Sequence, residues 1–248
     1  MLNVGIIGLG KILTGQHLNY ISQKYNILAT SDLRRDLKIN GIPFYTNYID
    51  LLSIKNIDAV FIFCDSKSQQ KIIADVVRFG KDIFVEKPPC NDAKELDKQI
   101  KLAHSAGRII FTGMNWLYGC DEFNDILKKS KKANKISIKS IHNKPFKKNI
   151  GLEPPSFHTI YSTLKLMPNP TEIQTHAYNV VEEKAYNFDI DLKGDGIISE
   201  IFINTNTGKM NDYFICKLDK NEYKINIDKR KKELGFKKEN DIFLKILN

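Results

Sequence analysis

The amino-acid sequence predicts an α/β protein, with a doubly wound parallel sheet in its first half and an α+β domain on a mostly antiparallel sheet in its second. Up to about residue 115, short continuous apolar runs alternate with segments whose apolar residues recur at helical spacing. After this point, strand-like segments follow one another with turn signals between them. The composition, 42% hydrophobic and 27% charged residues, is typical of globular proteins and excludes collagen-like or wholly disordered chains.

The strands expected in the first half are apolar without alternation, which is typical of strands buried on both faces of a parallel sheet. They are Asn3–Leu9, Ile27–Ser31, Pro43–Tyr45, Ala59–Cys64, Asp82–Val85 and Arg108–Thr112. The helices expected between them are Ile12–Gln23, Ile49–Leu52, Lys67–Phe79 and Asn91–Ser105. Gly80 and Gly107 follow two of these helices, where a glycine commonly ends a helix. This alternation implies right-handed crossovers in one parallel sheet.

The second half is expected to fold as one mostly antiparallel sheet backed by helices. The expected strands are Lys135–His142, Glu172–Tyr178, Ala185–Asp191, Gly196–Asn204, Asp212–Lys217 and Glu222–Ile227. The expected helices are Cys120–Lys131, Phe157–Leu166 and Glu239–Leu247, with a loop over Asn143–Pro155. We therefore expect two domains, residues 1–115 and residues 116–248.

The chain carries a net charge of +9, which is a weak argument for nucleic-acid binding. The basic residues are spread over both halves, and the lysine-rich runs 128–132 and 229–232 are typical of solvated surface. An anionic small molecule suits a modest positive field better. We expect a small-molecule partner, with DNA or RNA binding as the minor alternative.

No apolar run approaches the roughly 18 to 20 residues of a membrane span, and Met1 leads directly into a strand-like segment instead of a signal peptide. We therefore expect a cytoplasmic protein without a membrane partner. The four cysteines, Cys64, Cys90, Cys120 and Cys216, form no Cys-x-x-Cys pair. Reduced thiols and no metal site are the expectation.

The glycine-rich segment 8–12 (Gly-Leu-Gly-Lys-Ile) lies between a buried strand and a helix, as in dinucleotide-binding folds. Gly8 allows the tight turn, and Gly10 lets backbone N–H groups approach a pyrophosphate at the helix N-terminus. Leu13 replaces the third glycine of the fingerprint. The context predicts a Rossmann domain that binds NAD or NADP.

Asp32 ends the second expected strand, where an acidic residue would accept hydrogen bonds from the adenosine ribose. Leu33 and Arg34 follow beside the same expected site. Arg34 and Arg35 could instead hold the 2′-phosphate of NADP, because guanidinium groups pair well with phosphate. Asp32 favours NAD and the arginines favour NADP, so both cofactors stay open, with a slight preference for NAD.

Glu86, Lys87 and Pro88 follow directly after a buried strand. Ligands of open α/β sheets bind at the carboxyl ends of the strands, so Lys87 would point towards the cofactor crevice. There its ammonium group could donate to a substrate oxygen or transfer a proton. A solvated loop lysine is the alternative.

These segments together resemble the Gfo/Idh/MocA family, the relatives of glucose–fructose oxidoreductase and inositol dehydrogenase. The resemblance rests on the glycine turn, His17, the ungapped stretch from Asp58 to Pro88, and the segment 113–115, and it covers residues 2–116. It implies NAD(P)-dependent interconversion of a hydroxyl with a ketone on a sugar or cyclitol. A catalytically inactive relative that binds a dinucleotide as sensor, scaffold or partner subunit is the alternative.

The resemblance also implies roles for single residues. Those at the pyrophosphate and ribose would be Gly8, Gly10, Lys11, Ile12 and Asp32. Those beside the nicotinamide half would be Cys64, Asp65, Ser66 and Asn115, and Gln69 would be a cofactor-site residue at a position often held by histidine. Glu86 would be an acid beside the cofactor, and Lys87 the catalytic lysine.

A second catalytic candidate lies in the second half of the chain. The family typically has Asp-x-x-x-His-x-x-Asp at the start of a helix, and residues 154–161 retain the histidine as His158. Pro154 and Tyr161 replace the two carboxylates, so proton transfer and a structural role both stay open for His158. A sugar, cyclitol or nucleotide-sugar is the expected substrate. Members of the family often associate through the open face of the second-domain sheet, so Ile197–Ile203 could join copies of the chain into a homo-oligomer, with a place in the core as the alternative.

Overall fold

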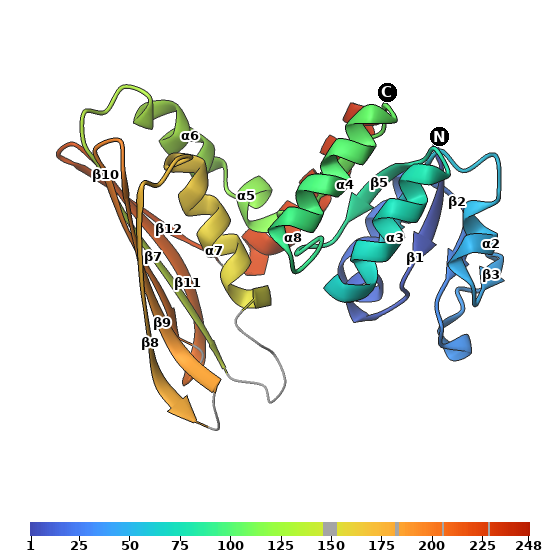
Figure 1. The fold of residues 1–248 in the computed structure, drawn as a ribbon, viewed down its shortest axis with the longest axis horizontal. Helices are drawn as coiled ribbons and strands as arrows, with labels where there is room; N and C mark the ends of the chain where they lie inside the picture. Colours follow the sequence, from blue (N-terminus) through green and yellow to red (C-terminus); the bar gives the residue numbers. More distant parts are fainter. Residues whose placement is uncertain (146–152, 182–183, 205, 228) are drawn as a thin grey trace. The chain divides into compact units, whose positions relative to one another are not determined.

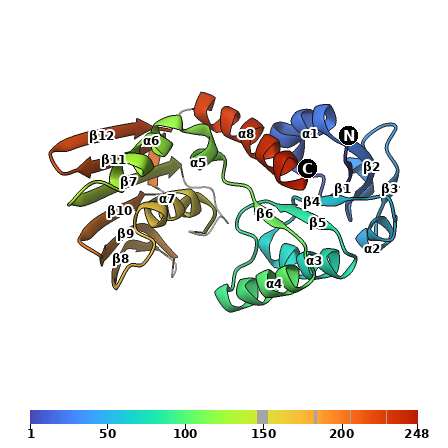
Figure 2. The same ribbon diagram turned by 90° about the horizontal axis from the view of Figure 1, so that it is seen from above.

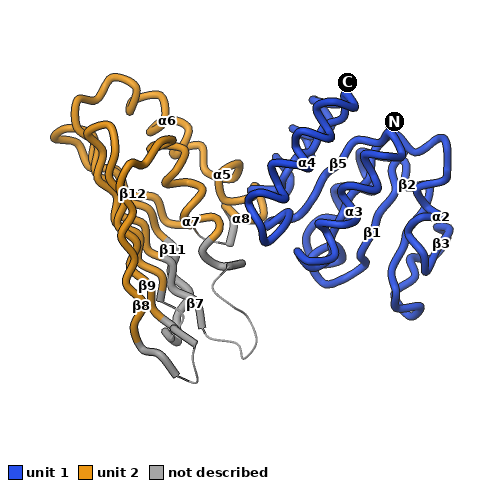
Figure 3. The backbone as a smooth tube through the Cα atoms, in the orientation of Figure 1, with its two compact units in different colours: residues 1–114, 236–248 blue, residues 115–235 orange. Residues whose placement is uncertain are grey.

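The computed structural model describes residues 1–145, 153–181, 184–204, 206–227 and 229–248. The chain divides into two compact units (Figure 3): residues 1–114 together with 236–248, and residues 115–235. The sequence placed all residues after 115 in one second domain. The structure differs, because Phe236–Asn248 groups with the first unit.

The first unit is built on a six-stranded sheet in which every neighbouring pair is parallel, as predicted. Its strands are β1 (Asn3–Ile7), β2 (Asn26–Ser31), β3 (Phe44–Tyr45), β4 (Ala59–Ile62), β5 (Asp82–Val85) and β6 (Ile110–Thr112). Their order is β3-β2-β1-β4-β5-β6. This is the Rossmann order, and the chain reverses its direction of travel between β1 and β4. Ligands of such sheets bind at this point, beyond the carboxyl ends of the strands.

Helices cover both faces of this sheet (Figure 2), with α3 and α4 on one face and α1 and α8 on the other. The helices are α1 (Leu18–Lys24), α2 (Tyr48–Leu52), α3 (Ser66–Arg78), α4 (Ala93–Ser105) and α8 (Lys229–Leu247), with a short 3₁₀ turn at Arg35–Leu37. The side chains of Asp65 and Asp92 accept hydrogen bonds from the N–H groups of Ser68 and Glu95. These bonds cap the starts of α3 and α4.

The buried strand residues alternate between the two faces of the sheet. Val60 and Ile62 on β4 belong to the aliphatic core that includes α3. Phe61 on β4 and Phe84 on β5 point to the other face, where their ring centroids lie 5.5 and 5.6 Å from that of Phe243 on α8. Phe243 has no exposed surface. The last helix therefore belongs to the first unit because it covers an aromatic face that would otherwise meet water.

The second unit contains a six-stranded sheet of order β12-β11-β7-β10-β9-β8. Only β7 and β10 pair in parallel, so the sheet is mostly antiparallel, as predicted. The strands are β7 (Ile136–Pro145), β8 (Glu172–Val181), β9 (Lys184–Gly194), β10 (Ile197–Asn204), β11 (Asn206–Leu218) and β12 (Asn221–Asn226). Helices α6 (Asp121–Ser130) and α7 (Glu153–Leu166) lie over one face of it (Figure 1).

Helix α5 (Asn115–Gly119) was not predicted. It packs backbone to backbone against the start of α8 in the second unit. A Cβ atom on Gly119 would overlap the Lys231 carbonyl, and one on Gly235 would overlap the Asn115 carbonyl. Among the described residues, no helix is long and apolar enough to cross a membrane.

Candidate active site

Glycine is required at residue 8, where β1 turns towards the first helical segment. The φ angle of Gly8 is +92°, which disfavours any residue with a Cβ. A Cβ atom there would also lie 2.8 Å from the Phe63 carbonyl and 2.9 Å from the Cys64 sulfur. Around Gly10, by contrast, the nearest neighbour of such an atom is the Arg34 guanidinium at 3.9 Å. Gly8 shapes the turn, and the space beside Gly10 is open to a ligand.

Leu13 occupies the place of the third fingerprint glycine, and its side chain is fully buried. It begins a π-helical turn, Leu13–His17, that leads into α1. The leucine points into the core and leaves the glycine turn open.

Asp32 connects the glycine turn to the loop after β2. Its Oδ2 accepts a hydrogen bond from the Leu9 N–H at 2.8 Å, and its Oδ1 accepts from the Arg34 N–H at 2.9 Å and the Arg34 guanidinium at 3.2 Å. Burial raises the pKa of Asp32, but the bonds from Arg34 and Leu9 outweigh burial and leave the pKa lowered. Asp32 is therefore an ionised carboxylate beside the turn.

A cleft of about 620 Å³ opens at the carboxyl ends of β1, β2 and β4, within the range of small-ligand sites. Seven of the predicted cofactor residues line it: Gly8, Gly10, Asp32, Leu33, Arg34, Cys64 and Asp65. Tyr48, Lys67 and Lys71 line it too, although no sequence motif indicates them. Lys67 and Lys71 are one turn apart on α3, and only the helical spacing of that segment could have placed them together. With Arg34 they give the cleft three cationic side chains.

The remaining predicted cofactor residues lie outside the lining of this cleft. Lys11 and Ser66 are next to lining residues along the chain, and Ile12 is two positions from Gly10. The described cleft combines an open glycine turn, a carboxylate at the end of β2 and cationic side chains. These are the features that a dinucleotide's pyrophosphate and ribose require, so the residues present fit NAD or NADP.

Cys64 is a half-buried thiol in this cleft. Burial, followed by the carboxylates of Asp32 and Asp65, raises the pKa of its thiol to about 12. A thiol with this pKa is almost entirely protonated at neutral pH and is a poor nucleophile. Cys64 can shape the cleft but not act as a covalent catalyst.

The end of β5 holds the Glu86-Lys87-Pro88 segment, in which Glu86 is buried, Lys87 is half-buried and the Lys87–Pro88 peptide bond is cis. The side-chain amide of Gln69 donates hydrogen bonds to the carbonyls of Glu86 at 3.0 Å and Pro88 at 2.7 Å. Gln69 is 1% exposed. Gln69 is therefore a buried residue, and its side chain fixes the backbone carbonyls on both sides of Lys87.

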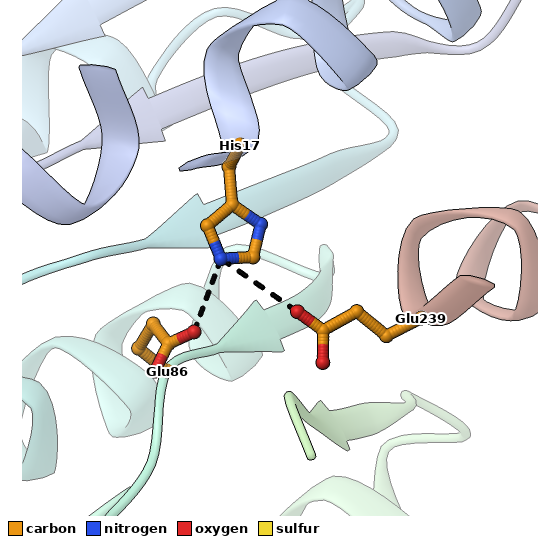
Figure 4. A group of neighbouring side chains, drawn as sticks. All are labelled: His17, Glu86 and Glu239. Atoms are coloured by element: carbon orange, nitrogen blue, oxygen red, sulfur yellow. Dashed lines mark hydrogen bonds and ion pairs between the residues drawn. The ribbon is translucent and has the colours of Figure 1, made fainter. Parts of the chain in front are cut away.

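Glu86 also belongs to a buried group of three side chains with His17 and Glu239 (Figure 4). Nε2 of His17 lies 3.1 Å from Oε1 of Glu86 and 3.6 Å from Oε1 of Glu239. Burial, and secondarily the Glu86 carboxylate, raises the pKa of Glu239 well above its usual range. The sequence does not indicate Glu239 as a site residue, because its helix is predicted to belong to the second domain.

The second unit holds the other two predicted residues. His158 on α7 is buried, and its ring stacks on that of Trp116 with centroids 4.9 Å apart. The Lys232 ammonium nitrogen lies over the Trp116 ring, 5.1 Å from its centroid. Asn115 is buried, and its amide donates a hydrogen bond to the Lys232 carbonyl at 3.4 Å. Lys87 and His158, the two predicted catalytic residues, therefore belong to different units.

Residues 2–114 match the sequence profile of the GFO_IDH_MocA family, described as an oxidoreductase family with an NAD-binding Rossmann fold. These residues belong to the Gfo/Idh/MocA oxidoreductase family. Myo-inositol 2-dehydrogenase from Thermotoga maritima is 28% identical over 122 residues, which cover 46% of this chain and 36% of that enzyme. The matched segment thus spans little more than a third of this relative.

Solved structures resemble the chain over nearly its whole length. Myo-inositol 2-dehydrogenase from Lactobacillus plantarum has a TM-score of 0.84 at 18% identity, covering 100% of this chain and 88% of that one. A 3-ketoreductase from Actinomadura kijaniata, in complex with NADP and TDP-benzene, has a TM-score of 0.82 at 13% identity, covering 99% and 89%. At these identities the likeness shows the fold, which is that of Gfo/Idh/MocA dehydrogenases.

Proposed function

We propose that this chain is an NAD(P)-dependent dehydrogenase or reductase acting on a hydroxyl or keto group of a sugar, cyclitol or nucleotide-sugar. One observation carries the proposal: the glycine turn and Asp32 face a cleft at the strand ends, and Lys87 follows the end of β5 in the same sheet. The Gfo/Idh/MocA relationship of residues 2–114 supports the cofactor class. The sugar-like substrate class is supported by the names of the relatives.

The residues of the first unit would bind and orient the cofactor. The open space at Gly10 lets the backbone approach the pyrophosphate. The Asp32 carboxylate would accept hydrogen bonds from ribose hydroxyls. When bound, NAD(P) supplies or accepts the hydride, and a residue of the chain has to donate or accept the accompanying proton.

Lys87 is our candidate for the residue that donates or accepts that proton. In the reducing direction its ammonium group would donate to the carbonyl oxygen of the substrate as the carbon gains the hydride. In the oxidising direction the neutral amine would accept the hydroxyl proton. His158 in the second unit is a further candidate for proton transfer, since histidine titrates near neutral pH.

We propose NAD as the preferred cofactor. Asp32 is ionised, and a carboxylate there would repel the 2′-phosphate of NADP. Arg34 is already paired with Asp32, although its side chain is 61% exposed and can turn. Lys67 and Lys71 offer the only other described cations in the cleft lining, and they would favour NADP if the 2′-phosphate reached them.

Titration with NADH and with NADPH, followed by nicotinamide fluorescence, tests cofactor binding and preference. We expect tighter binding of NADH, and Asp32→Ala should reduce that difference. Absence of binding of either dinucleotide below millimolar concentration would refute the proposed function.

Turnover with a panel of sugars, cyclitols and nucleotide-sugars tests the reaction. Lys87→Ala should lower kcat about 10²- to 10⁴-fold while dinucleotide binding persists. Lys101→Ala is the matched control, because Lys101 is 73% exposed on α4 and pairs with Asp97. If the two variants turn over equally well, Lys87 has no part in proton transfer.

A further inference from the structure

The side chains of His17, Glu86 and Glu239 point towards one another (Figure 4), and all three are buried. His17 and Glu239 have no exposed surface, and Glu86 is 7% exposed. Gly113 makes room for the two carboxylates. A Cβ atom on Gly113 would lie 3.3 Å from Oε2 of Glu239 and 3.3 Å from Oε1 of Glu86. Two acids therefore converge on one small, buried space.

The hydrogen bonds of Asn240 fix which nitrogen of His17 carries the proton. Nδ2 of Asn240 donates to the Phe236 carbonyl at 2.7 Å, and a carbonyl can only accept, so this atom is the amide nitrogen. The same Nδ2 lies 3.2 Å from Nδ1 of His17, which must accept. The proton is therefore on Nε2, which points to the carboxylates. A protonated Nε2 cannot bind a metal ion, which argues against a cation held by this group.

The Lys87 charge lowers the pKa of Glu239, but by less than burial and the Glu86 carboxylate raise it. The charged or titratable described groups that face Glu239 are His17, Glu86 and Lys87. The backbone N–H of Met114 faces the Glu239 carboxyl group and favours its ionised form, but burial and the Glu86 carboxylate outweigh it and raise the pKa of Glu239. Two ionised carboxylates here would repel each other in a medium of low polarity. One of them must carry a proton, and Glu239, the more deeply buried, is the one.

Glu86 connects this group to Lys87. Its Oε1 accepts from Nε2 of His17, while its Oε2 accepts from the Lys87 N–H at 3.1 Å. The Glu86 carboxylate thus fixes the backbone at Lys87, and so does the side-chain amide of Gln69. An ionised Glu239 would push the Glu86 carboxylate away from both donors.

We infer that Glu239 is a positioning residue. In its protonated form it keeps the Glu86 carboxylate hydrogen-bonded to the Lys87 N–H, and this bond fixes the position of the Lys87 side chain. The inference rests on the proposed function for the role of Lys87. The protonation of Glu239 and the link to Lys87 are separate from turnover and can be measured without it.

Infrared spectroscopy of this chain at pH 7 tests the protonation. We expect a band of a protonated carboxyl group that Glu239→Gln removes. The matched control is Glu222→Gln, since Glu222 is 53% exposed and pairs with Lys217. A wild-type spectrum without such a band, or a band that survives in Glu239→Gln, overturns the inference.

The link to Lys87 is tested by comparing Glu239→Gln with Glu239→Ala. Glutamine mimics the protonated acid, so the NMR resonance of the Lys87 amide should stay in place in Glu239→Gln and move in Glu239→Ala. Where turnover is measured, kcat should fall about 10- to 100-fold in Glu239→Ala, with KM nearly unchanged, and recover within about threefold in Glu239→Gln. Should Glu239→Gln shift the amide as much as Glu239→Ala does, an ionised carboxylate is needed and the inference is wrong.

Two further outcomes are informative. Stoichiometric zinc or manganese in the native protein by mass spectrometry would replace the inference with a metal site. A protein that has the protonated carboxyl band and the Lys87 amide response but binds no dinucleotide would leave the inference standing and refute the proposed function.

Discussion

The hydroxyl of Tyr25 donates a hydrogen bond of 3.0 Å to the backbone carbonyl of Asn240, a residue 215 positions later in the chain. Tyr25 directly follows α1, and Asn240 lies on α8. Lys24 adds an ion pair of 3.0 Å with Asp241. These contacts fix the end of the chain to the side of the sheet where Phe243 packs, so the last helix is a structural part of the Rossmann unit.

Removal of the Phe243 ring should strongly destabilise the first unit. The ring is fully buried against Phe61, Phe84 and Phe111, so Phe243→Ala leaves a cavity and should cost about 3–5 kcal/mol of unfolding free energy. Denaturation with urea measures this change. Ile246→Ala, on the same helix at a site 46% exposed, should cost less than about 1 kcal/mol. Equal losses in the two variants would contradict the packing described.

The two glycines of the turn should respond differently to alanine. Gly8→Ala places a Cβ against the Phe63 carbonyl at a positive φ, so it should lower the melting temperature as well as dinucleotide binding. Gly10→Ala meets no protein atom closer than 3.9 Å, so it should leave the melting temperature unchanged and weaken only dinucleotide binding. Calorimetry and fluorescence titration separate the two effects. Normal NADH affinity in Gly10→Ala would show that the pyrophosphate lies elsewhere.

The raised pKa of Glu239 predicts a dependence of stability on pH. The folded protein holds a proton on Glu239 that the unfolded chain releases above the usual pKa of 4.5. The stabilising contribution is complete below about pH 4.5 and is lost as the pH rises towards the folded-state pKa. Glu239→Gln removes this loss, so its unfolding free energy should exceed that of the wild type by about 1 to 3 kcal/mol at pH 8.

Urea denaturation between pH 4 and pH 9 measures this difference. It should vanish at the acidic end and grow steadily with pH, whereas Glu222→Gln should follow the wild type throughout. A difference that shrinks as the pH rises would mean that the pKa of Glu239 is lowered in the folded state.

Cys64 should resist alkylation although it lines the cleft. With the pKa of its thiol raised to about 12, hardly any thiolate is present at pH 8. Iodoacetamide followed by peptide mass spectrometry should therefore leave Cys64 unmodified in the native protein and modify all four cysteines after unfolding. Rapid native alkylation of Cys64 would contradict the raised pKa.

The sequence by itself determined the parallel sheet, the glycine turn and the strand end that carries Lys87. These features depend on local constraints: apolar runs that must be buried on both faces, and a turn at Gly8 that only glycine fits. The same local signals correctly predicted a mostly antiparallel sheet in the second half. They could not predict α5, because its contact with α8 depends on two glycines far apart in the chain.

Only the tertiary structure decided where the last helix belongs and what surrounds Lys87. No local sequence pattern indicates that Gln69 binds the carbonyls of Glu86 and Pro88. The local sequence around Glu239 predicts an exposed residue on a lysine-rich helix. Its burial beside His17 arises because Phe243, one turn further on, must cover the aromatic face of the sheet. Partners brought together from opposite ends of a chain leave no periodic pattern in its sequence, since their contact is set by the packing of whole elements.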